Sequence, residues 1–344
     1  MSETLLLLAG LTIVAVVIFD FTNGFHDASN MVATLVASRA MTPGSAALLV
    51  GGFTFLGPII GGTAVADTLG GIVDLGAVPV ATALTIIAAA ILGAIAWNIV
   101  TWRLGLPSSS SHALVGGLVG AVVVGAGGQD LDWGFTALRS GSLVGVTKVL
   151  VTLFTSPLIG LTVGFCVQRL IAWLRQGATV EANRTLRRAQ WITAAALAFA
   201  HGTNDAQKGM AIITLVLLLG GAMDSFAVPT WVIIVSATSI TLGTMTGGWR
   251  IVRTVGFGIY RLRPLHGFDA QLSSAAVVFG ASLFGGPVST THVVSSAIMG
   301  VGAAERPRSV RWTRAAEIAL AWLVTMPGAA LLAVAAWGVL RFTL

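Results

Sequence analysis

The sequence predicts an all-α protein that crosses a membrane in about 10–12 segments and consists of two repeats of opposite orientation. Three observations support this fold class: an apolar composition, apolar runs long enough to span a bilayer, and two sequence patterns that each occur twice. Of the 344 residues, 56% are hydrophobic and only 9% are charged. A soluble domain carries about 25% charged residues, so the composition excludes a soluble enzyme, a coiled coil and a disordered chain.

The apolar runs define the membrane segments in order along the chain. A spanning helix needs about 20 mainly apolar residues. Shorter or interrupted runs follow Pro107 and flank Pro287, and we expect broken or re-entrant helices there. The runs of adequate length lie near residues 4–20, 45–65, 79–101, 141–168, 190–200 with 209–222, 229–247 and 315–340.

Two sequence patterns are each repeated at nearly the same spacing. FTNGFHDASN at 21–30 resembles FAHGTNDAQK at 199–208, an offset of 178 residues. PSSSSH at 107–112 resembles PVSTTH at 287–292, an offset of 180 residues. Both pairs therefore indicate one duplication. We divide the chain into a first transmembrane repeat (1–168), a basic cytoplasmic linker (169–189) and a second, inverted transmembrane repeat (190–344).

Equivalent loops of the two repeats carry opposite charge. In the first repeat, the loops at 66–78 and 128–133 carry four aspartates and no Lys or Arg. Their counterparts near 248–263 and 305–314 carry eight arginines. Basic loops stay in the cytoplasm, so equivalent loops lie on opposite faces of the membrane and the second repeat is inverted. The net charge of +6 thus reflects orientation and not a nucleic-acid partner. Inverted repeats are typical of secondary transporters, with the site near the midplane.

Each copy of the first pattern places an aspartate within an apolar segment. A carboxylate at membrane depth costs roughly a few kcal/mol, so it must be paired, protonated or bound to a cation. Asp and Asn oxygens suit Na⁺-like ions. The flanking Gly24, Gly202 and Gly209 allow a helix to break and free carbonyls for the ion. We predict a cation site, with Na⁺ or a proton at Asp27 and Asp205. Its members are Asn23, Asp27, Asn30, Asn204 and Asp205.

Basic side chains near these aspartates leave a second interpretation open. Each aspartate could pair with a neighbouring His or Lys and only stabilise packing, although the duplication of the cluster is then unexplained. Asp20 either joins the Asp27 site or marks the end of the first span. In the functional interpretation, basic side chains orient the site or carry a proton. His26, His201 and Lys208 do so beside the aspartates, and His112 and His292 do so beside the hydroxyl runs that follow Pro107 and Pro287.

Each copy of the second pattern follows a proline with a run of hydroxyl residues. Proline in a first helical turn with Ser or Thr capping is a helix-start signal. A helix start presents free N–H groups and a partial positive charge, and the hydroxyls add donors, so it suits an oxyanion. Ordinary capping of a membrane helix is the alternative. We predict two anion cradles that meet at the centre, formed by Ser109, Ser110, Ser111, Ser289, Thr290 and Thr291.

Four stretches resemble the signatures of the PiT inorganic phosphate transporters: DFTNGFHDASN, AWNIVTWRLGLPSSSSHALVGG, HGTNDAQKG and GGPVSTTHVVSSAIMG. They occur in the family's order and the repeats that they mark cover nearly the whole chain. The resemblance implies a symporter and not an enzyme, in which inverted repeats enclose inorganic phosphate between re-entrant hairpins. By position, it implies cation binding at Asp27, Asn30, Asn204 and Asp205, and phosphate binding at the six cradle hydroxyls.

The departures from the family pattern suggest a compact prokaryotic member. His26 stands where many members have Asn, and sodium-coupled animal members place glutamates where Thr54 and Gln271 align. We therefore leave the coupling ion open as H⁺ or Na⁺, with phosphate carried free or with a divalent metal, and expect no other cofactor. We expect a multi-pass protein of the plasma (inner) membrane, and the glycine-rich helix faces favour a homodimer.

Two other functions fit part of the sequence. Asp27 and Asp205 could form the shared-proton dyad of an intramembrane aspartyl protease, but that chemistry has no use for paired hydroxyl cradles. A passive anion channel or a sulfate permease would use the cradles. Sulfate carries no proton at neutral pH, so acceptors such as Asp favour phosphate, which can donate.

Overall fold

The long apolar runs of this chain suit the interior of a membrane, where no water is present to bond with backbone N–H and C=O groups. The backbone must therefore satisfy its own hydrogen bonds, which favours helices. The computed structural model describes residues 2–174 and 181–342. The described residues are almost entirely helical; their only β-bridge is isolated, between Val73 and Leu131. The all-α prediction is confirmed. The longer helices are α1 (Glu3–Ala37), α2 (Pro43–Ile60), α4 (Val80–Leu104), α5 (Ser110–Gly125), α7 (Gly145–Leu174), α8 (Glu181–Leu219), α9 (Thr230–Thr246), α11 (Pro264–Leu283), α12 (Thr290–Glu305) and α13 (Trp312–Leu340).

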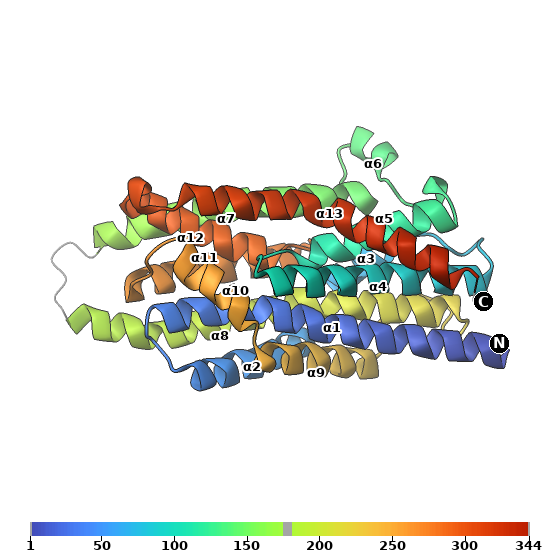
Figure 1. The fold of residues 1–344 in the computed structure, drawn as a ribbon, viewed down its shortest axis with the longest axis horizontal. Helices are drawn as coiled ribbons and strands as arrows, with labels where there is room; N and C mark the ends of the chain where they lie inside the picture. The colour runs from blue at the N-terminus through green and yellow to red at the C-terminus, as the bar shows by residue number, and fades with distance from the viewer. Residues whose placement is uncertain (1, 175–180, 343–344) are drawn as a thin grey trace.

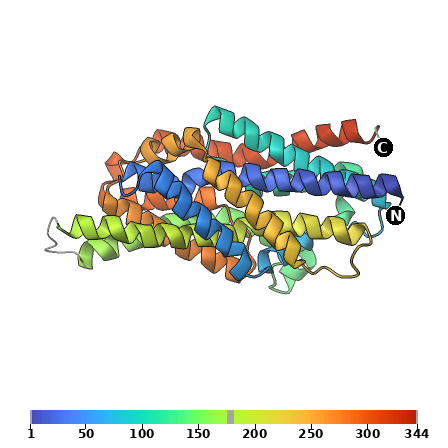
Figure 2. The ribbon, with the colours of Figure 1, turned by 90° about the horizontal axis from the view of Figure 1, so that it is seen from below.

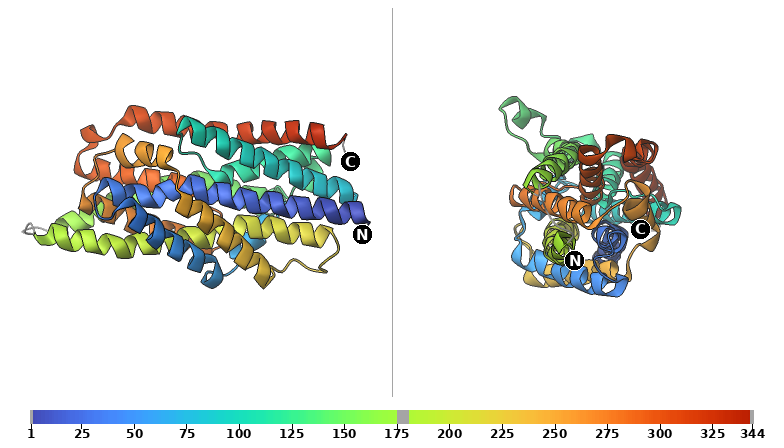
Figure 3. Two further views of the ribbon diagram at one scale, coloured as in Figure 1. Left: turned by 60° about the horizontal axis from the view of Figure 1, so that its bottom comes forward. Right: turned by 90° about the vertical axis from the view of Figure 1, so that its left-hand side faces the viewer.

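Most of these helices run side by side along the long axis (Figures 1 and 3). Among the described residues, five helices are long and apolar enough to cross a membrane, namely α1, α2, α4, α7 and α13. A bent pair gives a sixth: α9 and the short α10 (Trp249–Arg253), which a π-turn extends to Gly258, meet at 57°. The remaining short elements are α3 (Ala64–Gly70), α6 (Phe135–Arg139) and 3₁₀ turns at Gly128–Asp130 and Pro307–Ser309.

The two halves of the chain contain elements of matching order. Helices α1, α2, α4, α5 and α7 precede the centre, and α8, α9, α11, α12 and α13 follow it. Both termini lie at one end of the bundle, whereas α7 ends and α8 begins at the other (Figure 1). This placement fits an odd number of crossings per half, as the inverted repeat requires, and the repeat itself stays a prediction. Part of the predicted linker, including Arg175, lies outside the described residues.

Helices α2 and α9 cross the bundle obliquely and pack against each other (Figure 2). Each also packs on the long helix of the other half, α2 on α8 and α9 on α1. A Cβ atom at Gly57 of α2 would lie 2.3 Å from the Phe199 carbonyl oxygen, and one at Gly243 of α9 would lie 2.0 Å from that of Phe21. Phe21 and Phe199 are aligned in the repeated motif, so the contacts are reciprocal.

We expect Gly57→Ala to destabilise the protein although alanine favours a helix. The added methyl group meets backbone atoms of α8, which cannot move aside by changing a rotamer. Such overpacking lowers the free energy of unfolding by about 1–3 kcal/mol. The melting temperature of the detergent-solubilised protein should fall by several degrees. Gly52→Ala, on the same helix with nothing within 4 Å of its Cβ position, is the control and should melt no lower than wild type. Equal melting temperatures for the two variants would contradict the reciprocal packing.

The predicted break of the motif helices at Gly24 and Gly202 is wrong. Helices α1 and α8 are continuous through both motifs. A Cβ at Gly24 would lie 2.0 Å from the Ile240 carbonyl oxygen, and one at Gly202 would lie 2.2 Å from that of Thr54. These glycines are therefore required for close helix packing, and no backbone carbonyl is released there.

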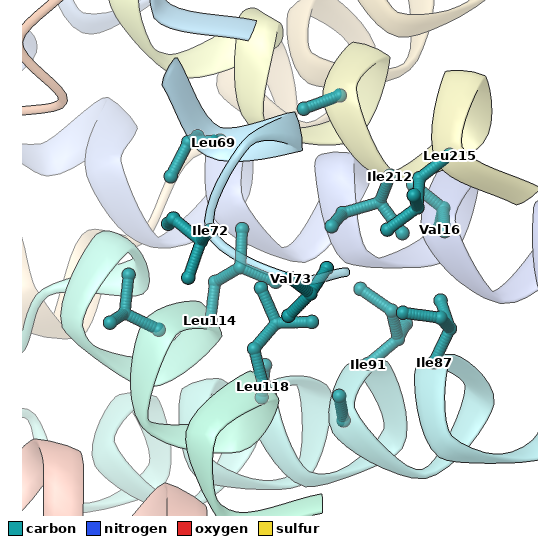
Figure 4. Packing of buried hydrophobic residues seen from close by; sticks show 14 of the residues in the cluster. Val16, Leu69, Ile72, Val73, Ile87, Ile91, Leu114, Leu118, Ile212 and Leu215 are labelled. Atoms are coloured by element: carbon teal, nitrogen blue, oxygen red, sulfur yellow. The ribbon is translucent and has the colours of Figure 1, made fainter. Parts of the chain in front are cut away.

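The chain reverses at two helical hairpins, α4–α5 and α11–α12. Gly105 (φ 68°) turns the chain after α4 and Gly285 (φ 65°) turns it after α11, a left-handed conformation that glycine adopts without strain. The first hairpin occupies one half of the bundle and the second occupies the other (Figure 1). Buried aliphatic side chains hold α4–α5 against α1 and α8, including Val16, Ile87, Ile91, Leu114, Leu118 and Ile212 (Figure 4). Both hairpins therefore present a helix start to the middle of the molecule.

Candidate functional site

The starts of α5 and α12 meet at the centre. Ser109 caps α5 by accepting a hydrogen bond from His112 N (3.2 Å), and Ser289 caps α12 in the same way through His292 N (3.2 Å). The Ser111 hydroxyl donates to the Val288 carbonyl (2.9 Å), so the first cradle contacts the turn before the second. Pro107 and Pro287 lie two residues before the caps, not in the first helical turn as predicted.

Two aspartates lie beside these helix starts. Asp27 comes from α1 and Asp205 from α8, and they are 2% and 0% exposed. Thr291 Oγ1 donates to Asp27 Oδ1 (2.7 Å). Thr290 Oγ1 lies 2.9 Å from Asp205 Oδ2 and 3.3 Å from Asp27 Oδ2, within hydrogen-bonding reach of both. One hydroxyl of the second cradle therefore lies between the carboxylates of both motifs.

The two carboxylates are close enough to repel each other strongly. Asp27, His201 and Asp205 each offer a ligand atom, and these atoms lie within 4.8 Å of one another. At an effective dielectric constant of about 20, two negative charges at that distance repel by roughly 3 kcal/mol. The arrangement therefore calls for positive charge. The Lys208 ammonium supplies one at Asp205, and the three side chains also offer ligand atoms for a metal ion.

Each carboxylate has basic or amide neighbours. His26 Nδ1 lies 3.2 Å from Asp27 Oδ1 and the Asn30 amide nitrogen lies 3.4 Å from the same oxygen. At Asp205, the Lys208 ammonium donates to Oδ1, and His201 Nδ1 lies 3.0 Å from Oδ2. The histidine and lysine neighbours proposed from the sequence are thus in ion-pair range.

Asn204 and Asn23 differ from their neighbours in the predicted cation set. Asn204 donates to Ser282 Oγ (2.9 Å) and the Gly286 carbonyl (3.1 Å), and its amide oxygen accepts from Val288 N (3.2 Å). Its amide therefore holds the turn between α11 and α12. The Asn23 amide is fully buried and has no hydrogen-bond partner among the described residues.

The two cradle histidines form a stack that the motif pattern did not reveal. The rings of His112 and His292 are 4.5 Å apart, and the His292 ring lies 4.0 Å from the ring of Trp322 on α13. His112 Nδ1 also contacts Ser109 Oγ (2.8 Å). These histidines therefore contact each other and α13 beside the two helix starts, and their orienting role stays a prediction. The sequence does not indicate that Trp322 contacts the site, because it is an isolated tryptophan in an apolar run.

Comparison with known proteins identifies the class to which this site belongs. The profile described as "Phosphate transporter family" matches residues 23–333, which include both motifs and both cradles. The chain belongs to the phosphate transporter family. The resemblance to the PiT transporters is confirmed, and so is the prediction that the chain is a transporter and not an enzyme. With its membrane-spanning helices, the transporter is a multi-pass membrane protein.

Relatives match the transporter over nearly its whole length. A Rhizobium meliloti protein named "Probable low-affinity inorganic phosphate transporter" is 44% identical, covering 95% of this chain and 94% of its own. A Bacillus subtilis protein of the same name is 40% identical, covering 98% and 99%. A solved structure titled "The sodium-dependent phosphate transporter" superposes with a TM-score of 0.79 at 26% identity, covering 99% of the transporter and 100% of that chain.

Proposed function

We propose that the protein imports inorganic phosphate by symport with a cation, H⁺ or Na⁺, through alternating access to the central site. The observation that carries the proposal is Thr290, whose hydroxyl lies between Asp27 and Asp205 at the start of α12. A cation reduces the repulsion between the carboxylates, and phosphate brings negative charge to the same place. Each ligand therefore favours the other, which is the coupling that symport requires.

The phosphate site in this proposal consists of the cradle hydroxyls and the free N–H groups of two helix starts. Ser110 supports it because its buried hydroxyl has no hydrogen-bond partner among the described residues and can donate to a phosphate oxygen. The hydroxyls of Thr290 and Thr291 bond to carboxylates here. When a cation or proton occupies Asp27, these two hydroxyls donate to phosphate oxygens in place of the carboxylates.

Alternating access follows from where the site lies. The six cradle residues and both aspartates are at most 2% exposed, so phosphate reaches them only if helices move. The hairpins α4–α5 and α11–α12 approach from opposite halves of the bundle, and we propose that they open in turn. The inverted repeats over 1–168 and 190–344 would make these openings equivalent.

The coupling ion and the form of phosphate are part of the proposal. The name of the sodium-dependent structural relative favours Na⁺, whereas His26, Thr54 and Gln271 favour H⁺. The Asp27–His201–Asp205 group suits a divalent metal carried with phosphate. The bacterial source of these relatives favours the plasma membrane as the location. The homodimer stays a prediction.

Uptake of radiolabelled phosphate into proteoliposomes tests the function, with Na⁺ and H⁺ gradients imposed separately. We expect one gradient to drive accumulation above the external concentration. Arsenate, of similar shape and charge, should compete and sulfate should not. Uptake that only follows the phosphate gradient would mean a facilitator, and sulfate competition equal to that of arsenate would contradict a phosphate site.

A further inference from the structure

The two repeated motifs differ at several positions, and one of these differences places a lysine in contact with the aspartate of the second motif only. With the offset of 178 residues, Asp27 aligns with Asp205 and Asn30 aligns with Lys208. In the structure, each side chain lies one helical turn after its aspartate and donates to it, and the Asn30 amide also donates to Thr291 Oγ1 (2.9 Å). The Asn30 amide lies 3.4 Å from Asp27 Oδ1, and the Lys208 ammonium donates to Asp205 Oδ1. Where the first motif has a neutral amide, the second has a full positive charge.

The Lys208 ammonium lies inside the protein and not at its surface. The side chain is 1% exposed, and an ammonium in such a place stays only if it is paired. Asp205 contacts it directly, and the buried Asp20 carboxyl of α1 lies against the neighbouring Gly209. Asp20 is a second departure from the repeat, because the same offset aligns it with Ala198. The Lys208 charge therefore has no counterpart in the first motif, and its direct partner is Asp205.

The groups in contact with each aspartate then decide where a cation is needed. Asp205 contacts His201, Thr290 and the Lys208 ammonium, so one permanent positive charge already lies against it. Asp27 contacts His26, Asn30 and two threonine hydroxyls, and none of these carries a permanent positive charge. The amide oxygen of Asn30 has no hydrogen-bond partner among the described residues and can accept an ion at this position.

We propose that the Lys208 ammonium is a built-in cation that occupies the Asp205 site permanently, so that only the Asp27 site takes up an external cation. This inference rests on the proposed symport and adds to it a stoichiometry. The two aspartate sites arose from one motif, but only the first exchanges its cation with solution. A site with an amide in both motifs would take up one more cation for each phosphate.

The test measures radiolabelled phosphate binding to the purified protein as a function of Na⁺ and, separately, of pH, with choline keeping the ionic strength constant. Lys208→Asn copies the first motif into the second. We expect phosphate binding at low cation concentration to weaken about 10-fold or more, to recover at high concentration, and to depend on cation with a Hill slope one unit steeper. Lys208→Arg keeps the charge and should keep the wild-type slope.

Asn30→Lys is the reciprocal variant, and it keeps the test decisive if Lys208→Asn does not fold. It places a second built-in cation at Asp27, so phosphate binding should lose its dependence on added cation. Lys148→Asn is the matched control: it removes the chain's other lysine, which contacts Thr68 on the outer part of the bundle, and should behave as wild type.

Two results would overturn the inference and leave phosphate transport intact. One is a Lys208→Asn variant that binds phosphate with the wild-type cation slope. The other is an Asn30→Lys variant that still needs the added cation as the wild type does. A folded Lys208→Asn variant whose phosphate binding no cation concentration restores would also overturn it, because Lys208 would then bind phosphate itself. A wild-type protein that binds no phosphate at all would overturn the proposed function as well.

Discussion

Asp27→Asn should reduce gradient-driven phosphate uptake about 100-fold or more, and Asp205→Asn should do the same. Each change keeps the shape of the side chain but removes the charge that Thr290 contacts. Removing one partner of a buried, hydrogen-bonded charge pair costs about 2–5 kcal/mol, and each 1.4 kcal/mol is a factor of ten. At Asp205 the change also leaves the Lys208 ammonium without its direct partner. Uptake in proteoliposomes measures both effects.

Asp67→Asn is the control for these variants. Asp67 is exposed on the short helix α3, and its replacement should leave uptake within about twofold of wild type, since surface changes have small effects. A monodisperse peak in size-exclusion chromatography separates loss of function from loss of fold. If either central variant folded and still accumulated phosphate against its gradient, the carboxylates would serve packing alone.

Thr290→Val should weaken phosphate binding about 10- to 100-fold while the fold is retained. Valine matches threonine in shape but removes the hydroxyl that lies between both carboxylates. A hydrogen bond to a charged group contributes about 1.5–3 kcal/mol, which is the basis of this range. Thr290→Ser keeps the hydroxyl and should restore most of the binding. Equilibrium binding of labelled phosphate at saturating cation gives the affinities.

Thr244→Val is the matched control for this substitution. Thr244 is also buried in a helix, but its hydroxyl donates only to the Ile240 carbonyl of its own helix (2.8 Å). We expect its phosphate affinity to be unchanged. Equal losses in the two variants would mean that a buried hydroxyl matters for stability at either place and that Thr290 has no special role at the site.

Much of the fold could be predicted from the sequence because membrane helices follow apolar length. The apolar runs at 79–101 and 315–340 correspond to α4 (Val80–Leu104) and α13 (Trp312–Leu340). Hydroxyl residues at the starts of α5 and α12 were also predictable, since capping is a local interaction. The break expected at Gly24 and Gly202 was wrong. A glycine can allow a helix to break, but it can also allow two helices to pack closely, and the sequence pattern is the same in both cases. Only the contacts with the neighbouring helix show that close packing applies here.

The arrangement within the site depends on contacts that no local pattern contains. Asn204 was grouped with Asp205 because the two are adjacent, but on a helix neighbouring side chains point in different directions. Its amide instead holds the α11–α12 turn through Ser282 and Gly286. The stack of His292 on Trp322 likewise joins two helices whose register the sequence does not specify.

Asp27 and its hydroxyl partners lie far apart in the sequence, so the ribosome synthesises them at different times. Thr290 and Thr291 follow Asp27 by 263 and 264 residues. At a synthesis rate of about 5–20 residues per second, the ribosome adds them roughly 13 to 50 seconds after Asp27. The only other residues of α1 that the structure places in contact with the Asp27 carboxylate are His26 and Asn30. Until α12 has been synthesised, these two neighbours are the hydrogen-bond partners that its own helix offers to Asp27.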